Sequence, residues 1–220
     1  MIALLLSLAN ANPTYNLPNA AVLSSEGSVF VGSGMAALRA GPLPSIRVGG
    51  TWHKDAWMLH ANSTLYIGQS NERFDNLSFR YLVVQNPSFR LAPTVLFSHH
   101  EGATALDRRT TGRLGLAMEA GKGKWKWDLS VNMVGMGLRL NRTEPMFILS
   151  TFDTLLALES GFRYEFSEQH FFRFALLGPM PTLRYGLPIG KGNYRIDITG
   201  ATLGTQHLLQ FDVVRLLGRK

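Results

Sequence analysis

Cysteine is absent from this chain of 220 residues, and its absence removes several kinds of chemistry. Without thiols there is no disulfide framework, no thiolate metal site and no cysteine nucleophile. Absence of cysteine also fits a protein that must cross an oxidising periplasm without mispairing. Charged residues are scarce as well, at 17% of the chain, against about 25% in a typical soluble domain.

Long apolar runs are also lacking, and none reaches the length of about 20 residues that a transmembrane helix needs. The N-terminal stretch from Met1 to Ala11 is short and apolar, and it ends in the small-x-small pattern Ala9-Asn10-Ala11. This pattern predicts a signal peptide over residues 1–11, cleaved before Asn12, although a basic leading region is missing. The alternative is a buried apolar tail. We expect an N-terminal extension over 12–26 and the folded unit over 27–220.

The chain is basic, with a net charge of +7 and a pI near 10. Its Lys and Arg residues are mostly single and spread along the sequence, with no basic run or helical stripe, which argues against a nucleic-acid partner. No phosphate-binding glycine loop or dinucleotide fingerprint is present, and no cofactor is expected.

Alternation of apolar and polar residues is the dominant pattern of the sequence. Between Trp125 and Asn132 every odd position is apolar and every even position is polar, as in a strand with two different faces. Residues 113–120 alternate in the same way, and the glycine-containing turn 121–123 joins the two runs. Comparable patterns predict strands at 27–38, 45–54, 56–67, 76–85, 88–99, 111–121, 124–138, 154–166, 169–177, 181–189, 192–200 and 206–217.

The connections between these strands alternate in length. Tight turns are expected near Asp55, Asn86-Pro87, 121–123, Ser167-Glu168 and Gly190-Lys191. Longer connections, at 68–75, 100–110 and 139–153, follow the third, fifth and seventh strands. Tight turns at one end and longer loops at the other resemble bacterial outer-membrane β-barrel proteins. The resemblance covers most of the chain, rests on pattern and names no specific family.

The resemblance implies an all-β fold, a closed antiparallel up-and-down transmembrane β-barrel of about 12 strands, with 10 as the alternative. It also implies the bacterial outer membrane as location, with the lipid bilayer and lipopolysaccharide around the barrel and other envelope proteins as candidate partners.

A soluble, lipocalin-like barrel with its apolar face inside is the competing interpretation. Bulky side chains throughout the apolar face, and arginine interleaved with small residues on the polar face, favour the membrane barrel. Aromatic residues near strand ends suit a girdle at the membrane interfaces. We expect this girdle to contain Trp52, Trp57, Trp125, Phe166 and Tyr185, together with Tyr66, Phe89, Phe171 and Tyr194.

The polar face then lines the lumen, and its cations outnumber its acids. The expected lumen cations are Arg47, Arg80, Arg90, Arg113, Lys126, Arg163, Arg173, Arg184 and Arg195. The expected lumen acids are Glu119, Asp128, Glu159, Glu165, Asp197 and Asp212. Two outcomes are open: paired charges that close the interior, or a water-filled pore that favours anions.

Three functions follow from these alternatives. The first is porin-like passage of small, preferably anionic solutes with the lumen arginines as selectivity elements. The second is a closed structural or docking barrel that anchors a partner complex in the outer membrane.

The third function is a barrel hydrolase, and its candidate residues are few. His60 and Asn62 share the lumen face, but Ser63 points the other way, so a nucleophile is not beside its base. The segment His99-His100-Glu101 with Asp107 offers metal-ligand types without a spacing that selects a metal. We therefore assign no catalytic residue and no metal site.

Overall fold

The computed structural model describes residues 27–38, 41–68, 72–101, 109–140, 145–149, 159–167, 169–177, 180–190, 192–203 and 205–218. The predicted signal peptide at 1–11, the extension at 12–26 and Asp107 lie outside these residues. No helix long and apolar enough to cross a bilayer occurs in the described part of the chain.

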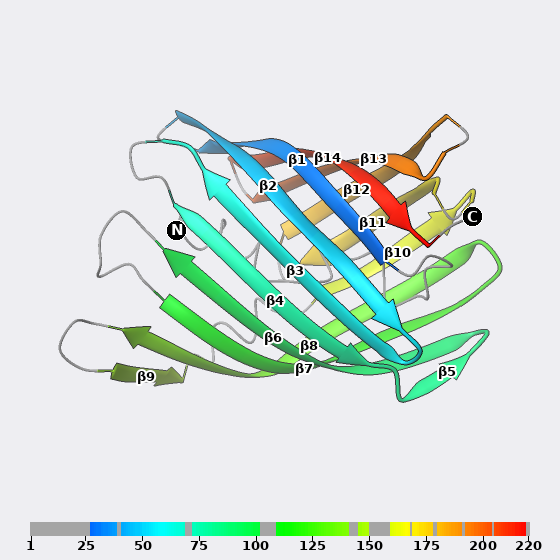
Figure 1. The fold of residues 1–220 in the computed structure, drawn as a ribbon, viewed down its shortest axis with the longest axis horizontal. Helices are drawn as coiled ribbons and strands as arrows, with labels where there is room; N and C mark the ends of the chain where they lie inside the picture. Colours follow the sequence, from blue (N-terminus) through cyan, green and yellow to red (C-terminus); the bar gives the residue numbers. More distant parts are fainter. Residues whose placement is uncertain are drawn as a thin grey trace.

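The described chain is a succession of antiparallel strands (Figure 1). The first seven are β1 (Gly27–Leu38), β2 (Gly41–Lys54), β3 (Trp57–Tyr66), β4 (Arg73–Tyr81), β5 (Val84–Asn86), β6 (Phe89–Glu101) and β7 (Arg109–Lys122). The next seven are β8 (Trp125–Leu140), β9 (Pro145–Leu149), β10 (Glu159–Glu165), β11 (Phe171–Leu177), β12 (Met180–Ile189), β13 (Tyr194–Leu203) and β14 (Gln206–Leu217).

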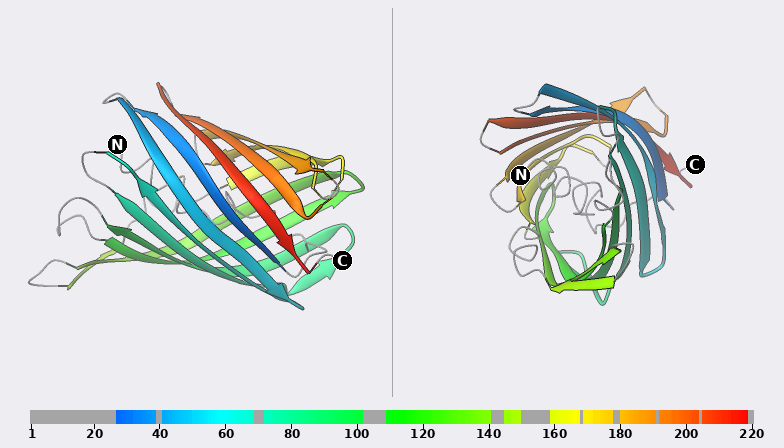
Figure 2. Two further views of the ribbon diagram at one scale, coloured as in Figure 1. Left: turned by 45° about the horizontal axis from the view of Figure 1, so that its top comes forward. Right: turned by 90° about the vertical axis from the view of Figure 1, so that its left-hand side faces the viewer.

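Twelve of these strands form a closed wall with up-and-down order. Each pairs with its neighbour in sequence, β10 pairs with β8, and β14 pairs with β1 to close the ring. The right-hand view of Figure 2 shows the strands curving round into a ring. Because closure satisfies every sheet edge, such a barrel can sit in lipid where an open sheet cannot. The predicted twelve-strand up-and-down barrel is confirmed.

The short turns lie together at one end of the barrel, which we call the short-turn end. Asp55 takes the left-handed conformation with φ 53°, and Gly123 and Gly190 do so at φ 63° and 62°. Left-handed residues are what two-residue hairpins between right-twisted strands require. Gly27 pairs with Leu217, so the barrel begins and ends at this same end.

Two strands lie outside the twelve-strand wall and correct the predicted strand list. The expected strand 76–85 is divided, because Leu82 and Val83 leave β4 and the short β5 pairs back onto β6. The expected loop 139–153 contains the end of β8 and all of β9, which pairs with β8. The following wall strand begins at Glu159, where the sequence pattern suggested 154.

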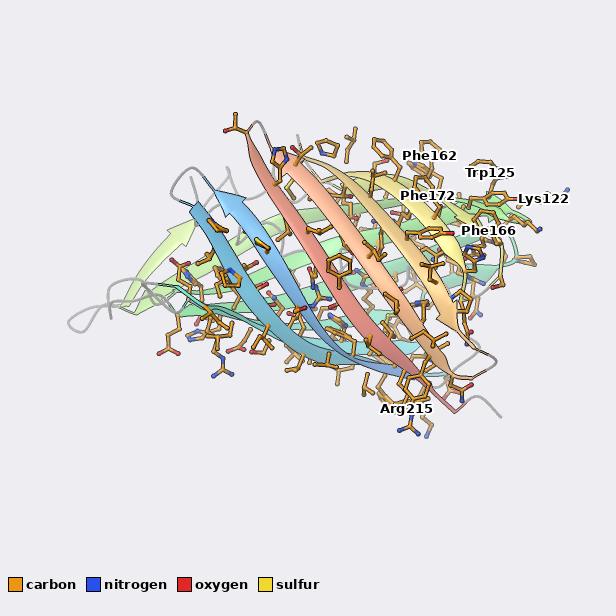
Figure 3. All side chains as sticks on the ribbon, turned by 90° about the horizontal axis from the view of Figure 1, so that it is seen from above. Lys122, Trp125, Phe162, Phe166, Phe172 and Arg215 are labelled. Carbon is orange, nitrogen blue, oxygen red and sulfur yellow. The ribbon has the colours of Figure 1, made fainter. Side chains whose placement is uncertain are left out.

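The outer face is an apolar belt. Val31, Leu114 and Phe162 are among the outward side chains more than half exposed. Figure 3 shows Phe162 and Phe172 pointing away from the ribbon. An aqueous protein does not expose apolar surface continuously around its circumference, so the belt places the barrel in a membrane.

Candidate functional site in the barrel interior

The inner face carries the buried polar and charged side chains. Along β3 alternate residues are buried, from Met58 to Tyr66, and the residues between them point outward. The same alternation buries arginines or carboxylates on β2, β4, β7, β8 and β10 to β14. This interior is the surface that a solute inside the barrel would meet.

Four basic residues form a row across neighbouring strands of the inner wall. Arg184 on β12 is paired in register with Arg173 on β11, Arg173 with Arg163 on β10, and Arg163 with Lys126 on β8. We call these four residues the cation row. Three strand spacings of about 4.8 Å give it a length of roughly 14 Å. Because barrel strands are tilted, the row climbs obliquely along the lumen.

Like charges directly opposite one another are destabilising, and carboxylates on the same or nearby strands hold the row together. The Arg173 guanidinium donates to Asp128 at 3.1 and 2.5 Å and lies 2.6 Å from Glu159. Arg163 contacts Glu165 at 2.6 Å and Glu119 at 3.3 Å. The arginines of the row are therefore fixed along the wall by acids.

A second charged cluster lies on β2, β12, β13 and β14. Asp197 accepts hydrogen bonds from Arg184 and Arg195, both at 2.6 Å. Arg47 on β2 reaches across β1 to Asp212 on β14, at 3.3 Å.

Gly32 lies between Arg47 and Asp212 in the register, and a Cβ atom there would stand 2.0 Å from the Asp212 carboxylate. The missing side chain at Gly32 is what lets the ion pair cross the intervening strand.

His60 belongs to a buried hydrogen-bonded chain on the same face. Its ring nitrogens lie 3.0 Å from Thr51 Oγ1 and 3.0 Å from Asn62 Nδ2, and Asn76 donates to Asn62 Oδ1 at 3.0 Å. The His60 ring also stacks on Phe30 at 6.1 Å between centroids. Ser63 points to the outer face, so no serine of this segment approaches His60.

Arg80 and Lys126 differ from the other inner cations. Within the described part of the chain, Arg47, Arg90, Arg163, Arg173, Arg184 and Arg195 each contact a carboxylate, whereas Arg80 and Lys126 have no such ion pair. Arg80 is only 2% exposed, and none of its three guanidinium nitrogens has a hydrogen-bond partner. A buried unpaired cation costs several kcal/mol, about 3–5 when a partner is lost.

His99 and His100 lie at the opposite end of the barrel, on β6. His99 points outward and lies 2.9 Å from Thr110 Oγ1. His100 points inward, stacks on Phe74 at 4.2 Å and lies 3.3 Å from Glu72. Among the residues that the structure describes, no group of three metal-ligating side chains converges.

Two groups of aromatic side chains lie at the short-turn end of the described barrel. Trp57 contacts Phe79 and Tyr81 at 4.7 and 4.3 Å. A second group contains Trp125, Tyr164, Phe166, His170 and Tyr185, linked by ring contacts and by a His170–Tyr185 hydrogen bond of 2.7 Å.

Trp125 and Phe166 lie together on the outer side in Figure 3. Trp52, beside the Asp55 turn, is half exposed. Tyr66 and Phe171, expected in the girdle, are instead 2% and 4% exposed, because they occupy inner-face positions of their strands.

Eleven of the charged residues singled out from the sequence are buried on the inner face, and three are partly exposed there. The buried ones are Arg47, Arg80, Arg163, Arg173, Arg184, Arg195, Glu119, Asp128, Glu159, Asp197 and Asp212. Arg90, Lys126 and Glu165 are the partly exposed ones, while the Arg113 side chain lies outside the described residues.

Sequence reasoning missed the inner hydrogen-bonding residues Thr51, Asn76 and Gln210. It also missed a small inner apolar cluster of Phe30, Val214 and Leu216. All of these residues alternate with outward-facing residues along their strands, and this alternation could have placed them on the inner face.

No family model and no curated protein sequence matches the chain. Among solved structures, the chain is similar to a KdgM porin in complex with disordered oligogalacturonate, with a TM-score of 0.59, 14% identity, and coverage of 86% of this chain and 98% of that one. An outer membrane channel from Pseudomonas putida F1 matches with a TM-score of 0.56 and 10% identity, over 91% of this chain and 99% of that one. The outer membrane phospholipase A from Escherichia coli matches with a TM-score of 0.54 and 8% identity, over 86% of this chain and 92% of that one. These likenesses show the fold: the chain has the closed barrel of bacterial outer-membrane proteins.

Proposed function

We propose that this protein is an outer-membrane channel for small anionic solutes, with inner-face arginines and lysine as the groups that favour anions. The observation that carries the proposal is the cation row, four basic residues in register along one oblique line of the wall. Fixed cations inside a low-dielectric wall raise the local concentration of anions and repel cations.

The ion pairs of the inner face follow the barrel wall. The inner-face pairs join residues of the same strand, of adjacent strands, or of strands separated by one other, as with Arg47 and Asp212 across β1. In the described residues these contacts follow the wall and none crosses the barrel. Arginines held in this way line the lumen without bridging it.

Similar solved structures support a channel at the level of the fold. The KdgM porin was solved with oligogalacturonate, a chain of carboxylate-bearing sugars, and the Pseudomonas putida protein is described as a channel. The fold also serves phospholipases. The assignment to anions therefore depends on this chain's own inner face.

Reversal potential in a planar bilayer tests the proposal. Under a KCl gradient at low salt, where screening is weak, we expect anion-selective currents, and Lys126→Glu should lower the chloride-to-potassium permeability ratio. Lys122→Glu is the matched control, because Lys122 is exposed on the outer side of the same end (Figure 3). Cation preference in the unmodified barrel would contradict the proposal.

A closed docking barrel is the second candidate, favoured by the number of buried ion pairs on the inner face. A refolded barrel that unfolds cooperatively yet never conducts would support this candidate. Co-purification of an envelope protein with that silent barrel would then identify what it holds.

A further inference from the structure

Arg80 lies against a small cavity inside the short-turn end. The cavity has a volume of about 30 Å³, and Arg80 lines it together with the apolar side chains of Met58, Leu82 and Ala92. The rest of its lining comes from the β2–β3 hairpin, namely His53, Asp55, Ala56 and Trp57. Met58 on β3 and Thr94 on β6 are the cross-strand neighbours of Arg80, so Arg80 lies between these two strands on the inner face. One water needs about 10–15 Å³ of cavity volume, so the space is large enough for the two oxygens of one carboxylate.

Two acids interact electrostatically with Arg80, but neither forms an ion pair with it. They are Glu159 on β10 and Asp128 on β8, whereas Arg80 lies on β4. Both contact Arg173, at 2.6 and 2.5 Å, and neither forms an ion pair with Arg80. The Nε and both Nη atoms of Arg80 remain buried without a hydrogen-bond partner. No other inner arginine with a described side chain has all three nitrogens in this state.

We propose that Arg80 and its cavity form a binding site for one carboxylate group of a small organic anion. A guanidinium presents a planar fork that matches a carboxylate with two parallel hydrogen bonds. Met58, Leu82 and Ala92 contact the hydrocarbon part next to the carboxylate. The inference rests on the proposed anion channel and deepens it, because it names the chemical class of the solute and the residue that binds it.

The test is a titration of the refolded barrel in detergent with sodium succinate at constant ionic strength. Trp57 borders the cavity, so we expect tryptophan emission to change and saturate, and Trp57→Phe to remove the signal. Arg80→Gln should weaken binding roughly tenfold or more, the loss expected for hydrogen bonds to a charged group. Arg80→Lys keeps the charge but loses the fork, and it should bind with intermediate affinity.

Lys54→Gln is the matched control, since Lys54 loses the same charge beside the same turn but is exposed and points outward. Its titration should equal that of the unmodified protein. Absence of saturation, or equal affinity in Arg80→Gln, would overturn the inference. Binding of inorganic phosphate as tight as that of succinate would overturn the assignment to carboxylates.

The titration needs no open pore, so it separates this inference from the proposed function. A barrel that binds succinate through Arg80 but conducts nothing would remove the channel and leave the site. Anion-selective currents with no Arg80-dependent binding would leave the channel and remove the site.

Discussion

Arg173 shows how a single side chain can organise several strands. It is 3% exposed on β11 and holds Asp128 of β8 and Glu159 of β10 at once. Its partners are buried too, so the guanidinium and the two carboxylates depend on each other for neutralisation. One residue therefore joins three strands through its ion pairs.

Replacing Arg173 by methionine should destabilise the barrel by about 3–5 kcal/mol, because two carboxylates stay buried without their cation. Urea unfolding of the protein refolded into vesicles measures the difference. Arg215→Met is the control: Arg215 lies on the outer side (Figure 3), 5.9 Å from the Tyr194 ring, and its loss should cost under about 1 kcal/mol.

A second variant separates charge from packing. Adding Asp128→Asn and Glu159→Gln to Arg173→Met removes all three charges, and replacing a whole buried ionic group is often close to neutral. The triple variant should therefore recover most of the lost stability. Equal costs for Arg173→Met and Arg215→Met would show that the buried ion pairs contribute little.

Strands and turns are the level at which the sequence was most informative. Alternation is a property of neighbouring residues, so the sequence alone separated inner from outer positions on β3 and β8. It was less informative where alternation is weak: nothing in 139–153 indicated that β8 would continue to Leu140 and pair with β9. It also placed Tyr66 and Phe171 outward, because aromatic character outweighed their position in the alternation.

The hairpin between β2 and β3 depends on the left-handed conformation of Asp55. Asp55→Gly should keep or slightly raise stability, since glycine enters this region without steric cost. Asp55→Val should cost about 1–2 kcal/mol, the penalty of a left-handed residue with a crowded Cβ. The urea midpoint of refolded protein ranks the variants.

Lys124→Val provides the comparison for this turn. Lys124 also lies in a tight turn and is exposed, but its φ is not positive. It should tolerate valine with little change. A similar loss at both positions would mean that side-chain polarity, and not backbone conformation, limits these turns.

At the scale of the whole molecule, strand number and topology were predictable, but the network of inner contacts was not. Strand number follows from counting alternating segments and turns along the chain. Arg173 and Asp128 are 45 residues apart, and Arg163 and Glu119 are 44 apart. Which charges meet across such separations is decided by the register of every intervening strand. The cation row and the isolation of Arg80 became visible only with the assembled barrel.

Closure of the ring between the first and last strands is the feature on which the membrane barrel depends. Val31 on β1 pairs in register with Val213 on β14, and both side chains are about half exposed on the outer face. Directly opposed residues have Cα atoms about 4.5–5.5 Å apart, within the range of roughly 4.4–6.8 Å that a disulfide spans. Because the chain has no cysteine of its own, any disulfide that forms must join the two introduced cysteines.

The variant Val31→Cys with Val213→Cys should therefore oxidise completely in the folded barrel and raise the free energy of unfolding by about 2–4 kcal/mol. The heated, unreduced chain should migrate as a compact loop on a denaturing gel. Val31→Cys with Leu209→Cys is the control: Leu209 lies on the same face but four residues along β14, about 13 Å from the pairing position, and should stay reduced. Oxidation of the control in place of the first pair would mean a shifted register at the seam. Failure of both pairs would mean that the ring is open there, and an open edge is incompatible with a barrel surrounded by lipid.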